Sequence, residues 1–67
     1  MDIFAKRLTE ALKANGMLQS ELARRLNLSH DSVNNYCHGR NLPSVKILIK
    51  ICNILDESAD YLLGLKN

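Results

Sequence analysis

Five polar side chains between residues 30 and 38 recur at the spacing of one helix face. They carry imidazole, carboxylate or carboxamide groups and are His30, Asp31, Asn34, Asn35 and His38. In a helical segment they form one stripe opposite Val33 and Tyr36. Such groups donate and accept the hydrogen bonds that reading the edges of DNA bases requires. A solvated helix face is the alternative, but the stripe holds no Glu or Lys, so we favour contact with DNA.

The remaining reactive side chains form no pattern typical of an enzyme or a metal site. Cys37 and Cys52 show no CxxC spacing and are expected to be free thiols. His30 and His38 are eight residues apart without a third ligand nearby, which argues against a metal site. The chain has no glycine-rich phosphate loop, and His30-Asp31 is only a pair of sequence neighbours. We therefore expect no catalysis, no cofactor and no small-molecule ligand.

Length and charge narrow the class of protein further. With 67 residues, the chain is expected to form a single domain over residues 1–67. Residues 1–55 hold eight Lys or Arg against four acids, and residues 56–67 hold three acids against Lys66. A basic body suits a polyanionic partner, although a solvated charged surface would give the same distribution. No apolar run approaches the ~18 residues of a membrane span, so we expect a cytoplasmic protein without a membrane partner.

Apolar residues at helical spacing predict five helices and no strand. The expected ranges are about Asp2–Ala14, Gln19–Leu26, His30–Cys37, Val45–Leu55 and Ala59–Leu63. Ser29, Ser44 and Ser58 can cap the last three helices through their hydroxyl oxygens. Gly16 and Asn27 can take the left-handed conformation that ends the first two. The short connections predict a compact all-α bundle.

The fourth helix is expected to have one apolar face inward and a second outward. The inward residues are expected to be Val45, Leu48, Ile51, Cys52 and Leu55. The outward residues are expected to be Ile47, Ile49 and Ile54, with Leu65 near the end of the chain. Exposed apolar side chains would suit a protein-binding module such as an antitoxin or adaptor, which is the alternative to DNA binding. Because a small protein must expose some apolar surface, this alternative has the weaker support.

Residues 19–38 have the layout of a helix-turn-helix unit. Two helices of about eight residues meet at the tight turn Asn27-Leu28-Ser29, and Ala23 is small where the helices cross. In such a unit the second helix enters the major groove of DNA. A plain corner between two helices has the same periodicity, so periodicity alone leaves both interpretations open.

The chain resembles the phage repressor and Cro-type (XRE-like) helix-turn-helix family over nearly its whole length. The resemblance rests on Gln19-Ser20-Glu21-Leu22-Ala23, Leu26-Asn27-Leu28-Ser29, Val33, Gly39, Pro43-Ser44 and Ser58-Ala59-Asp60-Tyr61-Leu62-Leu63-Gly64. It implies a lambda-repressor-like five-helix fold and a bacterial or phage-encoded regulator of transcription, associated with the nucleoid when bound. It also implies a weak homodimer that recognises a pseudo-palindromic operator in double-stranded DNA.

The same resemblance implies roles for individual residues. The positions matched to base reading are His30, Asp31, Asn34 and Asn35, with Asn34 nearest the sugar-phosphate wall. The positions matched to the DNA backbone are Gln19, Ser29, His38 and Arg40. The positions matched to the contact between protomers are Glu57, Ala59, Tyr61 and Leu62.

Several positions depart from the family pattern. Leu18 stands where the family usually has a Thr that caps the second helix, which removes a cap worth ~1 kcal/mol. Asp56 stands where a Gly usually follows the fourth helix. Asp31 places a negatively charged carboxylate at a position that would face DNA. It either accepts a hydrogen bond from cytosine or repels DNA. Leu12 and Cys37 replace an Arg–Glu ion pair of many relatives, so we expect Cys37 to pack against Leu12.

Overall fold

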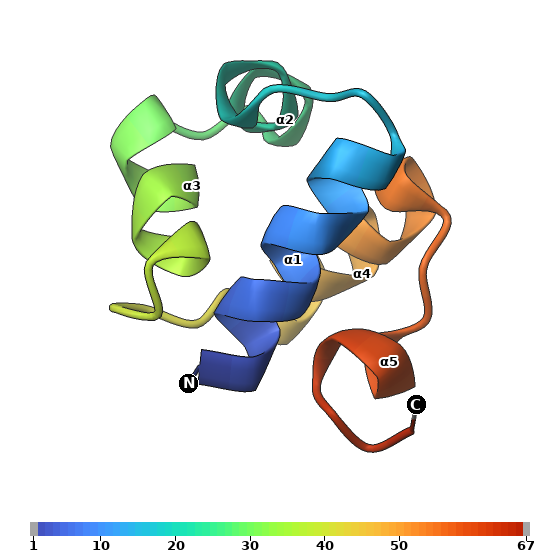
Figure 1. Cartoon of the computed structure of the whole chain (residues 1–67). Coiled ribbons are helices and arrows are strands. Elements are labelled where there is room, and N and C mark those ends of the chain that lie inside the picture. The colour runs from blue at the N-terminus through green and yellow to red at the C-terminus, as the bar shows by residue number, and fades with distance from the viewer. Residues whose placement is uncertain (1, 67) are drawn as a thin grey trace.

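The computed structural model describes residues 2–66 and contains five helices, whose arrangement is shown in Figure 1. They are α1 (Asp2–Ala14), α2 (Gln19–Leu26), α3 (His30–Cys37), α4 (Val45–Leu55) and α5 (Ala59–Leu62). No strand occurs in this part of the chain, so the all-α prediction is confirmed. Four ranges agree with the prediction, and the fifth helix ends one residue earlier than expected. Residues 1 and 67 of the predicted domain lie outside the described residues.

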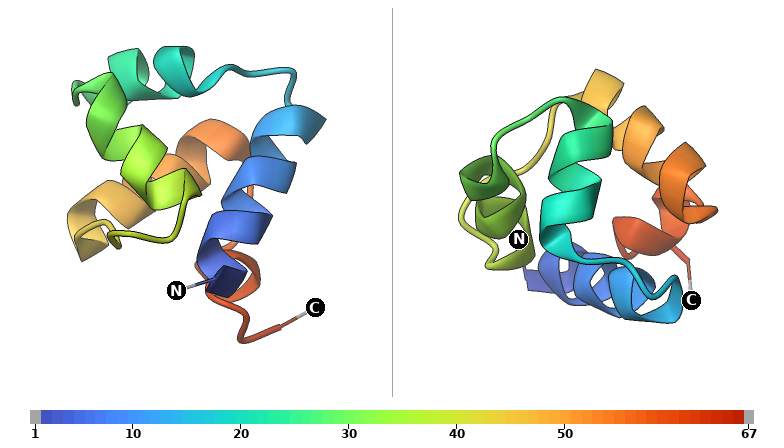
Figure 2. Two further views of the ribbon diagram at one scale, coloured as in Figure 1. Left: turned by 60° about the vertical axis from the view of Figure 1, so that its left-hand side comes forward. Right: turned by 90° about the horizontal axis from the view of Figure 1, so that it is seen from above.

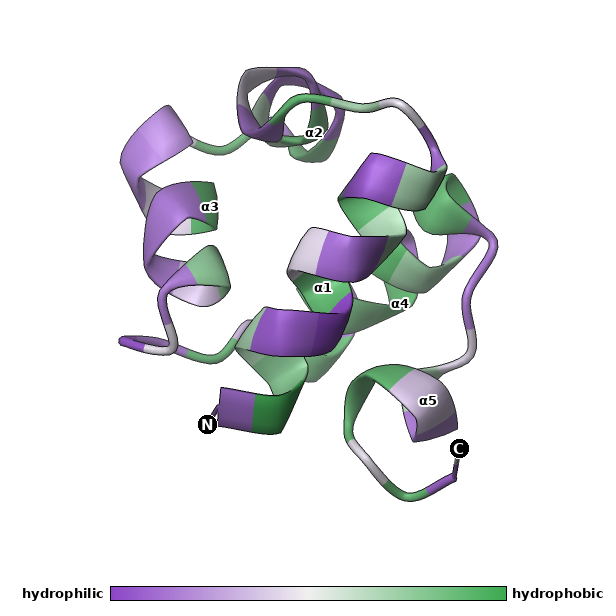
Figure 3. Ribbon diagram, viewed as in Figure 1, coloured by the Kyte–Doolittle hydropathy of each residue, from purple (hydrophilic) through white to green (hydrophobic). Residues whose placement is uncertain are grey.

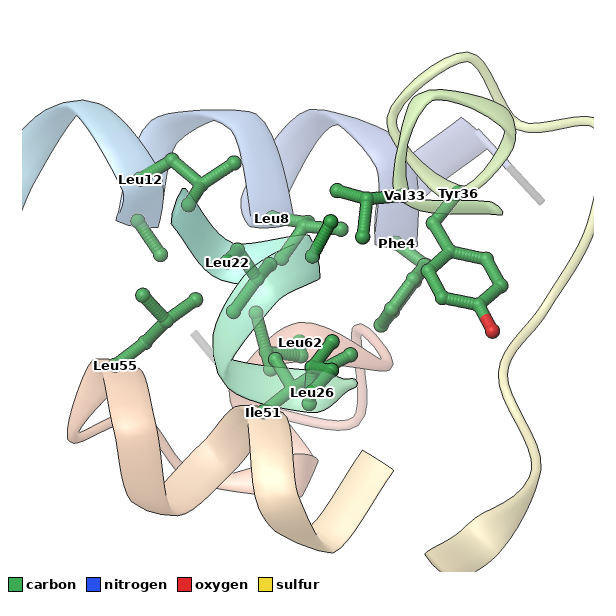
Figure 4. Close-up of a cluster of buried hydrophobic side chains, with 12 residues drawn as sticks. Phe4, Leu8, Leu12, Leu22, Leu26, Val33, Tyr36, Ile51, Leu55 and Leu62 are labelled. Atoms are coloured by element: carbon green, nitrogen blue, oxygen red, sulfur yellow. The ribbon is translucent and has the colours of Figure 1, made fainter. Parts of the chain in front are cut away.

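One cluster of apolar side chains fills the space between the helices (Figure 4). Every helix contributes, and the large side chains that are less than 2% exposed are Phe4, Leu8, Leu22, Val33, Ile51, Leu55 and Leu62. α3 packs against α1 and α2, whereas α5 packs against α1 and α4 (Figure 2). The core therefore fixes α3 from its inner side and leaves its outer side away from the other helices.

Three helices begin at a serine whose hydroxyl caps them, as predicted. Ser29, Ser44 and Ser58 each accept a hydrogen bond from the backbone N–H three residues later, at 3.2, 3.2 and 3.0 Å. α2 begins instead at Leu18, whose φ and ψ of −82° and 154° are close to the −70° and 154° of Ser29. The backbone at Leu18 thus has the geometry of a cap, but the side chain has no oxygen to accept the hydrogen bond.

A Leu18→Thr substitution is expected to raise the free energy of unfolding by about 1 kcal/mol, because its hydroxyl would cap α2. Glu21 three residues later completes the sequence pattern of a capping box. In a domain of this size, the melting temperature should rise by about 4–8 °C, measured by circular dichroism. Leu65→Thr is the matched control, because Leu18 and Leu65 are similarly exposed, at 72% and 71%. A Leu18→Thr variant that melts no higher than this control would contradict the expectation.

Two residues other than glycine take the left-handed backbone conformation at helix ends. Asn27 has a φ of 58° after α2, and Asp56 has a φ of 55° after α4. Their short polar side chains tolerate this region of conformational space better than most. Asp56 thus takes the left-handed conformation at the position where the family resemblance implies a glycine.

The face that α4 turns to the core differs in part from the prediction. The expected inward position of Val45 is wrong, because its side chain is 74% exposed. Val45 lies six residues before the buried Ile51, roughly 120° around the helix from it. Ile47 and Ile54 were expected outward but pack against the core, since they lie four residues before and three after Ile51. Ile49 is exposed, as predicted.

Leu12 lies on α1, and Cys37 is the last residue of α3. Leu12 is 4% exposed, and the half-buried Cys37 packs against the cluster to which Leu12 belongs. Burial raises the pKa of the Cys37 thiol above its ordinary 9.0, and a hydrogen bond with the Thr9 side chain acts in the opposite direction. Both cysteines are free thiols, as predicted.

Cys37 is expected to react slowly with disulfide reagents in the folded protein, because the thiolate is the reacting species and the raised pKa lowers its fraction. Burial also raises the pKa of Cys52, the second thiol, with a smaller contribution from nearby Glu57. A Cys52→Ala variant removes this thiol, so the label then reports on Cys37 alone. The labelling rate near neutral pH should be much lower in buffer than in concentrated urea. Equal rates in the two solvents would show that Cys37 is not protected.

Candidate nucleic-acid interface

The turn between α2 and α3 is built from backbone hydrogen bonds. The N–H of Asn27 donates to the carbonyls of Ala23 and Arg24, and the N–H of Leu28 donates to Ala23 at 2.9 Å. Ala23 is 3% exposed, and its small side chain permits the close crossing of the two helices. These contacts hold α3 at a fixed angle to α2.

The outer face of α3 presents the predicted polar stripe. His30, Asp31 and His38 are exposed, whereas Asn34 and Asn35 are half-buried. The opposite face contributes Val33 and Tyr36 to the core, at 0% and 9% exposed. The outer side of α3 is accordingly hydrophilic in Figure 3, while the side toward α1 is apolar. The structure therefore brings the predicted base-reading residues together on one accessible face.

Two hydrogen bonds hold side chains at the end of α3. The Nδ1 of His38 donates to the carbonyl of Asn34 at 2.8 Å, which leaves Nε2 for other contacts. The chain then turns through Gly39, at a φ of 74°, and brings Arg40 back toward α3. The Nη1 of Arg40 donates to the Oδ1 of Asn35 at 3.3 Å. Sequence reasoning missed this pair because a separation of five residues across a helix end matches no helical spacing.

The two other predicted backbone-contacting residues lie at helix starts. Gln19 is half-buried in the first turn of α2, where no side chain caps the backbone N–H groups. Such an uncapped turn suits a phosphate. Ser29 has a structural role, because its hydroxyl oxygen accepts from the N–H of Ser32 and lies 3.0 Å from the Ser32 hydroxyl. Any contact of Ser29 with DNA would be made by a hydroxyl already shared with Ser32.

α2, which precedes the turn into α3, carries charges of both signs. Arg24 and Arg25 are exposed at the end of α2, and Arg25 forms an exposed ion pair with Glu21 at 3.1 Å. No salt bridge among residues 2–66 includes Arg24 or Asp31. Arg24 is thus an exposed cation of α2 that pairs with no carboxylate of residues 2–66.

The predicted protomer contact around α5 requires one correction. Leu62 is 0% exposed and belongs to the core, so its side chain does not reach a surface that a second protomer can touch. A four-residue helix needs an anchor, and Leu62 supplies it. Glu57, Ala59 and Tyr61 are half-buried and retain some exposed surface.

Arg7, a residue of α1, holds the segment around α5 against α1, a role that sequence reasoning did not identify. Its Nη1 donates to the carbonyls of Tyr61 and Lys66 at 2.6 and 2.7 Å. Its guanidinium carbon lies 4.6 Å from the centre of the Tyr61 ring, in the arrangement of a cation–π contact. The partners are 54 and 59 residues away in sequence, so no local pattern signals them.

Across residues 2–66, no three His, Cys, Asp or Glu side chains cluster as metal ligands, and no pocket opens. None of the helices in this range is both long enough and apolar enough to cross a bilayer.

Comparison with known proteins agrees with this geometry. Residues 8–62 match the helix-turn-helix family. The chain is 39% identical over 59 residues to the HTH-type transcriptional regulator ImmR of Bacillus subtilis (strain 168), covering 88% of this chain and 46% of that protein. It is 36% identical over 61 residues to the uncharacterized HTH-type transcriptional regulator YqaE of the same organism, covering 91% and 53%.

A relative from a mobile element matches over the same region. The HTH-type transcriptional regulator for conjugative element R391 of Providencia rettgeri is 34% identical over 62 residues, covering 92% of this chain and 28% of that protein. The chain therefore spans about half, or less, of the length of these relatives.

Proposed function

The chain belongs to a helix-turn-helix family of DNA-binding transcriptional regulators, and we propose that it recognises a specific operator by placing α3 in the major groove. The observation that carries this proposal is the polar outer face of α3, set opposite Val33 and Tyr36, which hold the helix in the core. An α-helix fits the major groove, where its exposed side chains can reach base edges.

Residues on and beside this face would make two kinds of contact, with base edges and with the DNA backbone. His30, Asp31, Asn34 and Asn35 would face base edges, where they provide hydrogen-bond donors and acceptors. Four other residues would contact the sugar-phosphate backbone, which fixes the register of the protein. Gln19 and Ser29 lie at the starts of α2 and α3, and His38 and Arg40 lie at the end of α3 and in the loop that follows it.

The protein would act as a weak dimer on a pseudo-palindromic site in cytoplasmic DNA. Two half-sites about one helical turn apart would each hold one α3, and the shared contact would involve Glu57, Ala59 and Tyr61. One copy would make few contacts, so cooperative binding of two copies would supply the affinity. This placement of the contact depends on α5, which Leu62 and Arg7 hold against α1.

Selection from a random double-stranded DNA library with the purified protein tests the proposal. The expected result is a two-fold related sequence whose binding weakens steeply with salt, because phosphate contacts release counterions. Asn35→Ala should lose the preference at one base pair of each half-site and keep most of the non-specific affinity. Failure to enrich any sequence would contradict operator recognition.

A protein-binding role is the second candidate, favoured by the exposed apolar side chains Leu42, Val45 and Ile49, which are 53%, 74% and 56% exposed. The same salt titration separates the two functions. A complex formed through these apolar side chains should depend little on salt, whereas a DNA complex should dissociate as salt increases.

A further inference from the structure

We propose that Arg40 is a positioning residue for Asn35: it holds the amide of Asn35 in one orientation and thereby sharpens the base preference at the position that Asn35 reads. This inference rests on the proposed function and assigns to Arg40 more than a contact with the DNA backbone.

Two hydrogen bonds connect Arg40 to Asn35. The backbone N–H of Arg40 donates to the carbonyl of Asn35 at 3.0 Å, which holds the loop against the last turn of α3. The guanidinium Nη1 then reaches the side-chain Oδ1 of Asn35 at 3.3 Å. The main-chain bond keeps the guanidinium near the amide, so less freedom is lost when the side chains pair.

The chemistry of the pair fixes which end of the amide faces Arg40. A guanidinium has only donors, so the oxygen of Asn35 must face it and the NH₂ group must face elsewhere. The oxygen keeps a second lone pair, because a carboxamide oxygen accepts two hydrogen bonds. Asn35 can therefore still accept from adenine N6 and donate to adenine N7 while it is bound to Arg40.

The hydrogen bond from Arg40 disfavours a second, flipped orientation of the Asn35 amide, which an asparagine without this partner could adopt. An amide that is free to flip by half a turn can direct its NH₂ donors at the O6 and N7 acceptors of guanine. With the oxygen held by Arg40, this flipped arrangement requires breaking the Arg40 hydrogen bond. Asn35 then discriminates between adenine and guanine more strongly than the amide alone would.

The position of Arg40 is compatible with a phosphate contact at the same time. The guanidinium has five N–H donors, and the bond to Asn35 uses one of them. In free protein this exposed hydrogen bond is weak, but the water excluded by bound DNA would strengthen it. Arg40 would thus couple a backbone contact to the reading of a base.

A double-mutant cycle tests the proposal. Fluorescence anisotropy measures the binding of the selected operator and of its three single-base variants at the position that Asn35→Ala identifies. The proteins are the wild type, Arg40→Ala, Asn35→Ala and the double variant, each checked for its fold by circular dichroism. Arg24→Ala is the matched control, because it removes an exposed guanidinium of α2 that forms no hydrogen bond with Asn35.

Arg40→Ala is expected to reduce discrimination at this base pair by about threefold or more, in addition to reducing the salt slope by about one per protomer. Arg24→Ala should leave the discrimination unchanged. In the Asn35→Ala background, Arg40→Ala should have no further effect on discrimination.

Two results would overturn the inference while leaving operator recognition intact. The first is that Arg40→Ala retains full discrimination at this base pair. The second is that Arg40→Ala reduces the discrimination by the same factor in the wild-type and Asn35→Ala backgrounds. If the wild-type protein selects no operator at all, the proposed function and the inference fail together.

Discussion

A Leu12→Arg variant is expected to be strongly destabilised. Leu12 is 4% exposed within the core, and no carboxylate stands at Cys37 to pair with a cation. An uncompensated buried charge costs about 3–5 kcal/mol. A domain of this size has only about 3–10 kcal/mol of stability in total, so a large part of it would be lost. Urea denaturation followed by circular dichroism measures the change.

Two further variants make this expectation specific to the charge. Leu12→Met, which keeps the volume and adds no charge, should cost less than about 1.5 kcal/mol. Adding Cys37→Glu to Leu12→Arg should recover stability relative to Leu12→Arg alone, because the two side chains can form the ion pair implied by the family resemblance. A Leu12→Arg protein as stable as the Leu12→Met protein would refute the burial assigned to this position.

Leu62→Ala is expected to lower the free energy of unfolding by about 2–5 kcal/mol, because it leaves a cavity in the core between α5 and the other helices. Leu62 is 0% exposed within one chain, so the loss should be independent of protein concentration. Urea denaturation at two concentrations tenfold apart tests both parts of this expectation. A residue at the contact between protomers would instead give a loss that grows with concentration.

Leu65→Ala provides the matched control for Leu62→Ala. It removes the same atoms from a side chain that is 71% exposed, so it should change stability by less than about 0.5 kcal/mol. Equal losses at the two positions would show that Leu62 does not anchor α5.

The helix boundaries were predictable because they depend on local chemistry. Ser29, Ser44 and Ser58 accept hydrogen bonds from neighbouring backbone groups, and nothing distant changes this preference. Asn27 likewise ends α2 through its own backbone conformation. The polar stripe of α3 was predictable for a related reason, since Val33 and Tyr36 determine which side of the helix is buried.

The contacts that were missed depend on tertiary packing. Tyr61 and Leu62 are adjacent and both apolar, and only the packing of α5 on α1 decides that Leu62 is the buried one. Val45 is equally apolar but lies where the first turn of α4 faces away from the core. Arg40 could not be paired with Asn35 from spacing, because the turn between them reverses the chain.

The attachment of α5 also has a consequence for hydrogen exchange. A helix of four residues has no independent stability, so α5 persists through Leu62 and the two carbonyl contacts of Arg7. These contacts can open without separating α2 from α3, and the amide hydrogens of α5 should exchange with solvent before those of the helix-turn-helix unit. If Tyr61 lies at the protomer contact, operator binding should slow exchange in α5 as well as in α3. Assembly on DNA would then stabilise the least stable segment of the fold.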